Sequence, residues 1–102
     1  MKIALYRSFF KAFSNKTRLQ ILALLRQSPK NVSQICAETG LEQSRVSHNL
    51  RCLLQCGFVD VQPNGKERIY SLDGDKIVPI LNSIGEHIER YKKRLEDCKV
   101  IQ

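Results

Sequence analysis

Residues 32–56, VSQICAETGLEQSRVSHNLRCLLQC, decide the fold of this chain. The pattern predicts a short helix over residues 32–39, capped by Ser33 and ended by Gly40, which stands where a left-handed residue closes a helix. A second helix is predicted to begin near residues 42–44 and to end at about residue 56. Its apolar stripe consists of Val46, Leu50, Leu53 and Leu54. Two helices joined by a glycine-containing turn are typical of a helix-turn-helix.

The start of the second helix is rich in short polar side chains. Val46 would hold the helix to the core and leave the neighbouring polar residues facing outward. Glutamine, arginine and serine have donors and acceptors that match base edges and phosphates in a DNA major groove. The predicted DNA contacts of this helix are Gln43, Ser44, Arg45, Ser47 and His48.

The period of the sequence changes after the second helix. Residues 58–62 and 68–72 alternate apolar and polar side chains, and Pro63-Asn64-Gly65-Lys66 lies between them. Asn-Gly between two alternating runs is a strong signal for a β-hairpin. The tip would offer Lys66 and Arg68 to phosphates or to a minor groove. A solvated helix and an ordinary surface hairpin are the alternative, and the order of the elements argues against it.

Further helices flank this unit. Residues 3–13 and 16–27 are predicted helices, the second capped by Asn15 and ended before Pro29. A last helix over about residues 75–98 carries an apolar stripe of Ile77, Ile80, Leu81, Ile84, Ile88, Tyr91 and Leu95. A stripe of about five turns exceeds what a small domain needs for its own core, so it predicts helix pairing across a dimer axis. We expect one mainly α winged helix-turn-helix domain over residues 1–102, forming a homodimer through its N- and C-terminal helices.

Composition narrows the class of protein. The 102 residues include 17 Lys and Arg against 10 Asp and Glu, a net charge of +7 that favours a polyanionic partner such as double-stranded DNA. The longest apolar run, residues 21–25, is far too short to span a membrane, and no signal-peptide core is present. We therefore expect a cytoplasmic protein with reduced cysteines. No nucleophile–base–acid set or phosphate loop points to an enzyme.

Several motifs together resemble one family. FSNKTRLQIL at residues 13–22, QSRVSHNL at 43–50, CGFV at 56–59 and GKERIYSL at 65–72 are similar to segments of the ArsR/SmtB family of metal-responsive repressors. The resemblance covers about residues 3–92. His48-Asn49 reverses the order that is more usual in the family. The resemblance implies a dimer that represses its own operon and leaves operator DNA when an effector binds.

Two cysteines lie on the predicted DNA-reading helix. Cys52 and Cys56 are four residues apart, so they share one face, at the edge of the core. Two adjacent thiolates bind a soft ion such as cadmium, lead, zinc or arsenite much better than a hard cation. The alternative is that both are small buried hydrophobic residues. Cys36, beside Ile35, is expected to be a core residue.

A third thiol, Cys98, stands at the end of the last predicted helix. It would either complete a three-thiolate site, in the same chain or in the partner, or be an exposed thiol near the terminus. Cys52, Cys56 and Cys98 resemble in order and spacing the ligands of the cadmium- and lead-sensing CmtR-like branch of the family. His87 alone does not make the family's other zinc site, because Gly74, Lys76 and Arg90 occupy its remaining ligand positions.

Two other functions stay open from the sequence. The same thiols could serve a redox- or persulfide-sensing repressor, although a Cys52–Cys56 disulfide inside an intact helix would be strained. The chain could also be a metal-handling or protein-interaction module without specific DNA binding. A steep fall of affinity with salt, together with discrimination of an operator from random DNA, would distinguish the repressor from that module.

Overall fold

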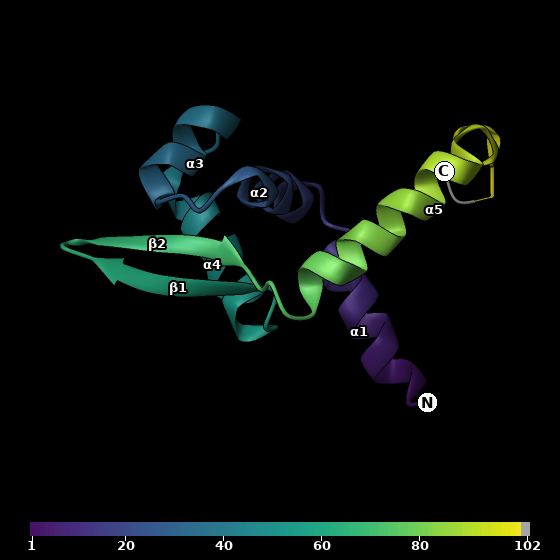
Figure 1. Cartoon of the computed structure of the whole chain (residues 1–102), viewed down its shortest axis with the longest axis horizontal. Helices are drawn as coiled ribbons and strands as arrows, with labels where there is room; N and C mark the ends of the chain where they lie inside the picture. The colour runs from purple at the N-terminus through teal and green to yellow at the C-terminus, as the bar shows by residue number, and fades with distance from the viewer. Residues whose placement is uncertain (101–102) are drawn as a thin grey trace.

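A computed structural model describes residues 1–100; the last two residues of the predicted domain, 101 and 102, lie outside the described part. The elements, in chain order, are α1 (Ile3–Phe13), α2 (Lys16–Gln27), α3 (Val32–Thr39), α4 (Gln43–Gln55), β1 (Val59–Asn64), β2 (Glu67–Leu72) and α5 (Ile77–Asp97). Figure 1 shows the hairpin projecting at one end and α1 and α5 extending at the other. The predicted fold class, mainly α with a β-hairpin, is confirmed.

Local signals explain where the first helices begin and end. The side chain of Asn15 accepts a hydrogen bond from the backbone N–H of Arg18, so Asn15 caps α2 as predicted. The prediction of Ser33 as the cap of α3 is wrong. Asn31 caps this helix through a capping box in which its side chain and that of Gln34 each accept a backbone N–H, at 2.8 Å. Gly40 ends α3 at a φ of 75°, as predicted.

The hairpin pairs β1 with β2 in antiparallel register, from Val59 opposite Leu72 to Asn64 opposite Glu67. The strands therefore continue closer to the tip than predicted and leave only Gly65 and Lys66 as the loop. Gly65 has a φ of 64°, which glycine adopts without strain. An isolated bridge joins Lys30 to Tyr70 with N–H···O distances of 3.0 and 2.8 Å. This bridge anchors the hairpin to the segment between α2 and α3.

The core lies where α2, α3 and α4 meet the base of the hairpin. Its fully buried side chains include Ile21, Ile35, Val46, Leu50, Leu53 and Phe58. Cys36 is half-buried and packs against this cluster, as expected. The rings of Phe9 and Phe13 contact that of Phe58 at centroid distances of 5.2 and 4.7 Å and attach α1 to the core.

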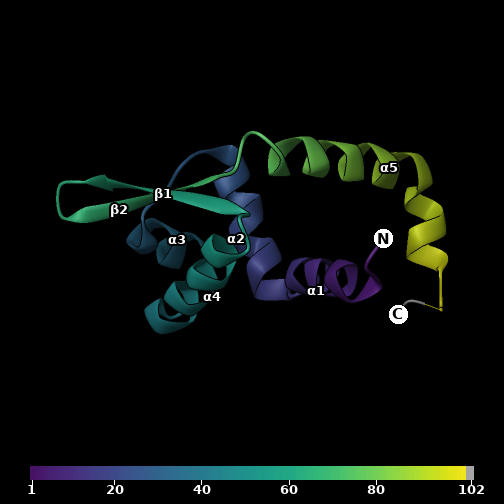
Figure 2. The same ribbon diagram turned by 90° about the horizontal axis from the view of Figure 1, so that it is seen from below.

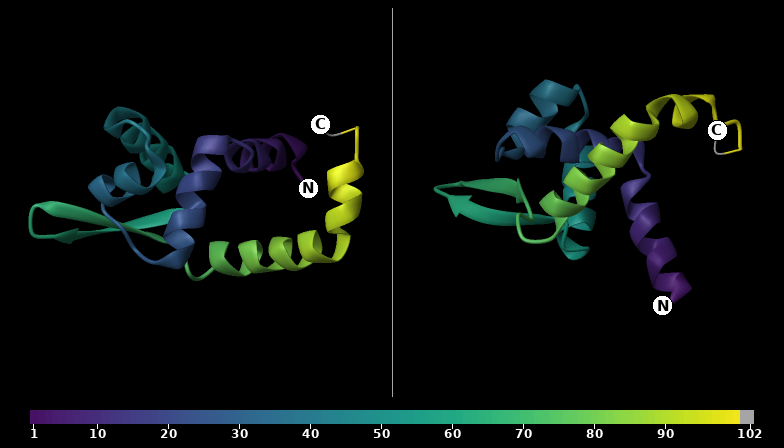
Figure 3. Two further views of the ribbon diagram at one scale, coloured as in Figure 1. Left: turned by 90° about the horizontal axis from the view of Figure 1, so that it is seen from above. Right: turned by 45° about the vertical axis from the view of Figure 1, so that its right-hand side comes forward.

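The last helix differs from its prediction. It was expected as one continuous helix over residues 75–98, but α5 runs from Ile77 to Asp97 and is interrupted at Tyr91, whose φ and ψ are −113° and 20°. Figure 3 shows the final turns leaving the axis of the first part. Among residues 1–100, no helix is both long and apolar enough to cross a membrane.

Candidate DNA interface and thiol site

The helix α4 presents a polar face because its apolar face is anchored. Val46, Leu50 and Leu53 are at most 1% exposed. Four of the five residues predicted to contact DNA from this helix are exposed, namely Gln43, Ser44, Arg45 and His48, and the fifth, Ser47, is half-buried. The arrangement fits the second helix of a helix-turn-helix, whose first residues face the major groove.

The hairpin tip carries the other two residues predicted to contact DNA. Lys66 and Arg68 are both exposed, and the tip projects beyond the helices (Figure 1). Pro63 stands opposite Arg68 in the ladder. The sheet has two strands, so both are edge strands, where the missing N–H of a proline is tolerated. The tip can therefore lie against a phosphate backbone without disturbing the core.

A buried junction that was not predicted connects α1, α2 and α4. The Arg18 guanidinium donates hydrogen bonds to the carbonyl of Ala12 at 2.7 Å, to Asn49 Oδ1 at 3.3 Å and to the carbonyl of Lys11 at 3.4 Å. Asn49 is 6% exposed, and its amide donates to the carbonyl of Arg45 at 2.9 Å. Asn49 therefore supports the interior of α4 and is not available to read bases. In the sequence, only Thr17-Arg18 within the FSNKTRLQIL segment pointed to this junction.

The two thiols of α4 lie together beside that junction. Cys52 is half-buried and Cys56 is exposed, and the two thiols are close enough for each to affect the other's electrostatics. Cys56 forms the C-cap of α4, where its backbone N–H donates to the carbonyl of Cys52 at 3.0 Å. Neither thiol is a fully buried core residue. The pair is therefore accessible and adjacent, as chelation of one soft ion requires.

The local electrostatics favour the protonated form of Cys56. The pKa of the Cys56 thiol is raised from its ordinary value, first by partial desolvation and then by repulsion from Cys52 and hydrogen bonding to it. The positive charge of Arg18 acts in the opposite direction and lowers this pKa. Arg18 thus contacts the backbone of α1 and a side chain of α4, and its charge also acts on the thiol at the end of α4.

The third predicted ligand is not brought to this pair within one chain. Cys98 is the half-buried C-cap of α5, and the end of α5 lies opposite the hairpin (Figure 1). Among the described residues 1–100, no three or more His, Cys, Asp or Glu side chains are grouped so that they could hold a metal ion. A site that includes Cys98 would therefore need a second copy of the chain.

The fold and the exposed α4 face define a winged helix-turn-helix protein. The model of the arsR family of bacterial regulatory proteins matches residues 15–61. The regulator NmtR of Mycobacterium tuberculosis is 34% identical over 90 residues, which is 88% of this chain and 75% of that protein. The chain belongs to the ArsR family. Because the family and these relatives are transcriptional regulators, the prediction that the chain is not an enzyme is confirmed.

Two other relatives bear on the effector. A probable mercury resistance operon repressor of Streptomyces lividans is 30% identical over 73 residues, which is 72% of this chain and 58% of that protein. The chain thus spans less than two thirds of that repressor. The regulator CmtR of Mycobacterium bovis is 31% identical over 74 residues, 72% of this chain and 63% of that protein.

Solved structures agree with the fold. The crystal structure of Rv0081 of Mycobacterium tuberculosis superposes with a TM-score of 0.83 at 28% identity, covering 90% of this chain and 93% of that one. A solution structure of a homodimeric winged helix-turn-helix DNA-binding domain, Mb0332 of Mycobacterium bovis, gives a TM-score of 0.77 at 29% identity, covering 88% and 86%. The fold of this chain is therefore shared with these two structures.

Proposed function

We propose that this chain is a homodimeric repressor whose α4 and hairpin bind operator DNA and which leaves the operator when a soft metal or metalloid ion binds Cys52 and Cys56. The observation that carries the proposal is the placement of two accessible thiols, one turn apart, on the same helix as the predicted base contacts. An event at these thiols acts on the DNA-reading element itself. The proposed unit is a single winged-helix domain.

Dimer formation is supported by apolar surface that the chain leaves uncovered. Large hydrophobic side chains are exposed along α1 and α5, and those with the most relevant positions are Leu5 (65%), Phe10 (59%), Ile84 (39%) and Ile88 (45%). Full burial of such a side chain contributes about 1.5–3 kcal/mol. A relative with this fold is described as a homodimer, which supports pairing of this chain. A symmetric dimer would present two copies of α4 to half-sites about one DNA turn apart.

The thiol pair fits a soft ion by its chemistry. Cys52 and Cys56 would each give up a proton and supply one thiolate, and cadmium, lead, zinc and arsenite all accept thiolate ligands. Cys98 of the partner subunit is the proposed third ligand, because one chain alone does not assemble a group of three. The relative described as a mercury resistance operon repressor supports a soft metal effector.

Arg18 offers a route from the thiols to the dimer. Deprotonation of Cys56 places negative charge near the guanidinium that joins the end of α1 to Asn49 of α4. A bond from α4 to Cys98 of the partner subunit would further fix α4 relative to the dimer axis. A small tilt of each α4 would then break the match with two half-sites, and we expect the coupling free energy to be about 1–3 kcal/mol.

The test is a cadmium or lead titration of the operator complex, followed by thiolate charge-transfer absorbance and by DNA anisotropy. We expect both signals to change together in the wild type and to be lost in Cys52→Ser/Cys56→Ser. Cys36→Ala is the matched control, because Cys36 packs against the core away from α4's free face, and it should retain both signals. Release of DNA by metal in the double serine variant would overturn the thiol site.

The position of Cys98 is tested by mixing two inactive variants. A heterodimer of Cys52→Ser/Cys56→Ser with Cys98→Ser contains one complete site if Cys98 acts across the dimer, and none if it acts within one chain. We expect the purified heterodimer to show about half of the wild-type cadmium absorbance, since one of its two sites is complete. No recovery in a verified heterodimer would rule out the proposal that Cys98 acts across the dimer.

The redox-sensing alternative is disfavoured by the same geometry. A thiol attacks an oxidant as thiolate, and the pKa of Cys56 is raised, not lowered. The two cysteines are also one turn apart in an intact helix, where a disulfide would be strained. Mild oxidant followed by non-reducing mass spectrometry should therefore detect no Cys52–Cys56 disulfide at concentrations that leave DNA binding unchanged.

A further inference from the structure

The excess positive charge of the chain is confined to its first third. Residues 1–37 contain seven basic residues (Lys and Arg) and no acidic residue (Asp or Glu), whereas residues 38–102 contain ten basic and ten acidic residues. Five of these seven charges lie in α1 and α2, and Lys2 and Lys30 lie just outside these helices. The helix α4 adds Arg45 and Arg51 and has no acidic residue, whereas Lys66 and Arg68 of the hairpin are balanced by Asp60 and Glu67. Much of the positive charge that attracts a polyanion therefore lies outside the predicted reading elements.

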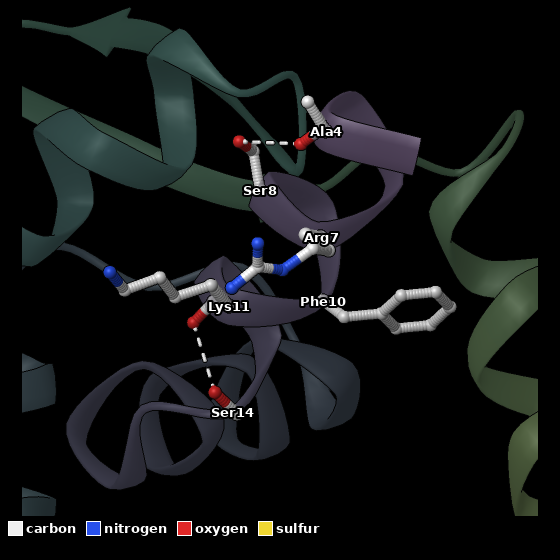
Figure 4. A pocket seen from close by; sticks show the side chains of 6 residues that line it. All are labelled: Ala4, Arg7, Ser8, Phe10, Lys11 and Ser14. Atoms are coloured by element: carbon white, nitrogen blue, oxygen red, sulfur yellow. Dashed lines mark hydrogen bonds between the residues drawn. The ribbon is translucent and has the colours of Figure 1, made fainter. Parts of the chain in front are cut away.

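One face of α1 concentrates part of this charge. Arg7 and Lys11 are exposed and lie one turn apart, so they share a side of the helix. The apolar side chains of Phe9 and Phe13 occupy another side and contact Phe58. The polar face borders an open depression, shown in Figure 4, that is lined by Ala4, Arg7, Ser8, Phe10, Lys11 and Ser14. No acidic residue stands anywhere in α1.

The position of α1 relates this face to α4. Along the long axis of the molecule the order is hairpin tip, α4 and α1, and α1 lies with α4 on the side away from the first part of α5 (Figures 2 and 3). Arg18 holds the end of α1 beside α4 through Lys11, Ala12 and Asn49. In the proposed dimer, α1 would lie between the two copies of α4, over the DNA that separates the half-sites.

We propose that Arg7 and Lys11 contact the phosphate backbone at the centre of the operator, between the two half-sites bound by α4. The inference rests on the proposed function, because it requires a dimer on duplex DNA. Its support is charge complementarity, the absence of acidic residues from α1 and continuity with the α4 face. Phosphate contacts of this kind add affinity and fix the position of the protein without reading sequence. Each chain would contribute two such contacts, and they would form on a duplex of any sequence.

The test is the salt dependence of DNA binding by Arg7→Gln/Lys11→Gln, in which glutamine keeps a high helix propensity. Each phosphate contact contributes about 0.9 to the slope of log K against log salt, so loss of four contacts per dimer should reduce the slope by about 3–4. The loss should be equal on operator and on random DNA. Lys92→Gln/Lys93→Gln, which removes the same charge from the far part of α5, should leave the slope unchanged.

Two measurements keep the inference separate from other failures. Sedimentation must show that Arg7→Gln/Lys11→Gln is still a dimer; an unchanged slope in that dimer overturns the inference. Phosphate ethylation interference with the wild type should show inhibition at the central phosphates, and its absence overturns the inference even if the variant dissociates. If the wild type binds no operator at all, the proposed function itself fails.

Discussion

The helices α4 and α5 use their apolar residues in opposite ways. The 13 residues of α4 include four buried ones, among them Val46 and Leu53 at 0% exposure. The 21 residues of α5 include one buried residue, Ile77, while Ile84 and Ile88 remain 39% and 45% exposed. The position of α4 is therefore determined within its own chain, whereas the exposed face of α5 is proposed to be covered only when a second chain packs against it.

The difference indicates how the proposed signal would work. An ion held by thiols of α4 alone would act within one chain, on α4 itself and through Arg18 on the end of α1. An ion held by Cys52, Cys56 and Cys98 of the partner subunit would connect the fixed helix to the element whose position depends on the dimer.

The largest effect should follow from breaking the exposed apolar face. In Phe10→Glu/Ile88→Glu, two charges would have to be desolvated in the proposed interface, so we expect a folded monomer. Operator affinity should fall by about 10²–10⁴-fold, because the two copies of α4 no longer bind as a linked pair. Sedimentation velocity measures the oligomeric state, circular dichroism the folding, and DNA anisotropy the operator affinity.

The control for this variant adds the same charge elsewhere. Gln20→Glu/Gln27→Glu places two carboxylates at exposed polar positions of α2 and should remain dimeric. A dimeric Phe10→Glu/Ile88→Glu protein with wild-type affinity would show that α1 and α5 do not form the interface.

A smaller effect is expected at the junction between the two regions. Arg18→Gln removes the bonds to Ala12 and Asn49 and the charge near Cys56. The ratio of operator affinities without and with cadmium, typically about 5–150-fold for such coupling, should move toward one. Anisotropy titrations measure this ratio, and the melting temperature reports any loss of stability.

Arg26→Gln is the matched control, because Arg26 belongs to the same helix but donates its hydrogen bond to Asn82 of α5. It should keep the wild-type ratio. If Arg18→Gln also kept that ratio while both variants bound cadmium, the junction would be structural only.

Local sequence signals were sufficient for most of the fold. The order and type of all elements, the Asn15 cap, the Gly40 terminus and the hairpin follow from short-range patterns. The exposure of Gln43, Arg45 and His48 was predictable as well, since helical periodicity places them opposite Val46. These features depend on residues within one or two turns of each other.

The remaining features depend on long-range contacts. Asn49 lies at the edge of the apolar stripe, one turn from Val46 and from Leu53, but its partner Arg18 lies 31 positions earlier, so local spacing could not reveal the hydrogen bond between them. The interruption of α5 at Tyr91 was missed because the apolar stripe continues through it in sequence. The distance of Cys98 from the α4 thiols within one chain is a property of the tertiary fold, and spacing alone left both arrangements open.

A moderate effect of pH on cadmium affinity is expected from the protonation of Cys56. Because the pKa of Cys56 is raised, metal binding must displace its proton at neutral pH. Apparent cadmium affinity should increase with pH over roughly pH 6 to 9, by about tenfold per pH unit for each proton displaced. Competition with a chelator of known affinity measures the apparent cadmium affinity at each pH. Arg18→Gln should weaken binding further at low pH, since Arg18 lowers this pKa. A pH-independent affinity would contradict thiol ligation.

The smallest effect is expected at the start of α5. Here the Asp73 carboxylate accepts backbone N–H bonds from Lys76 and Ile77 at 3.0 and 3.2 Å. The start of α4 has no such bond, because the side chain of Glu42 does not cap it. The bond from Lys76 is the main cause that lowers the pKa of Asp73 below its ordinary value. The stabilisation is therefore complete above the ordinary carboxyl pKa of about 3.9 and is lost as the pH falls through the lowered value. Asp73→Asn keeps an oxygen that can accept these bonds and removes only the charge, so it should melt slightly below the wild type at neutral pH. The gap should close in acid, and a gap of constant size down to about pH 2 would show that the carboxylate charge does not hold the start of α5.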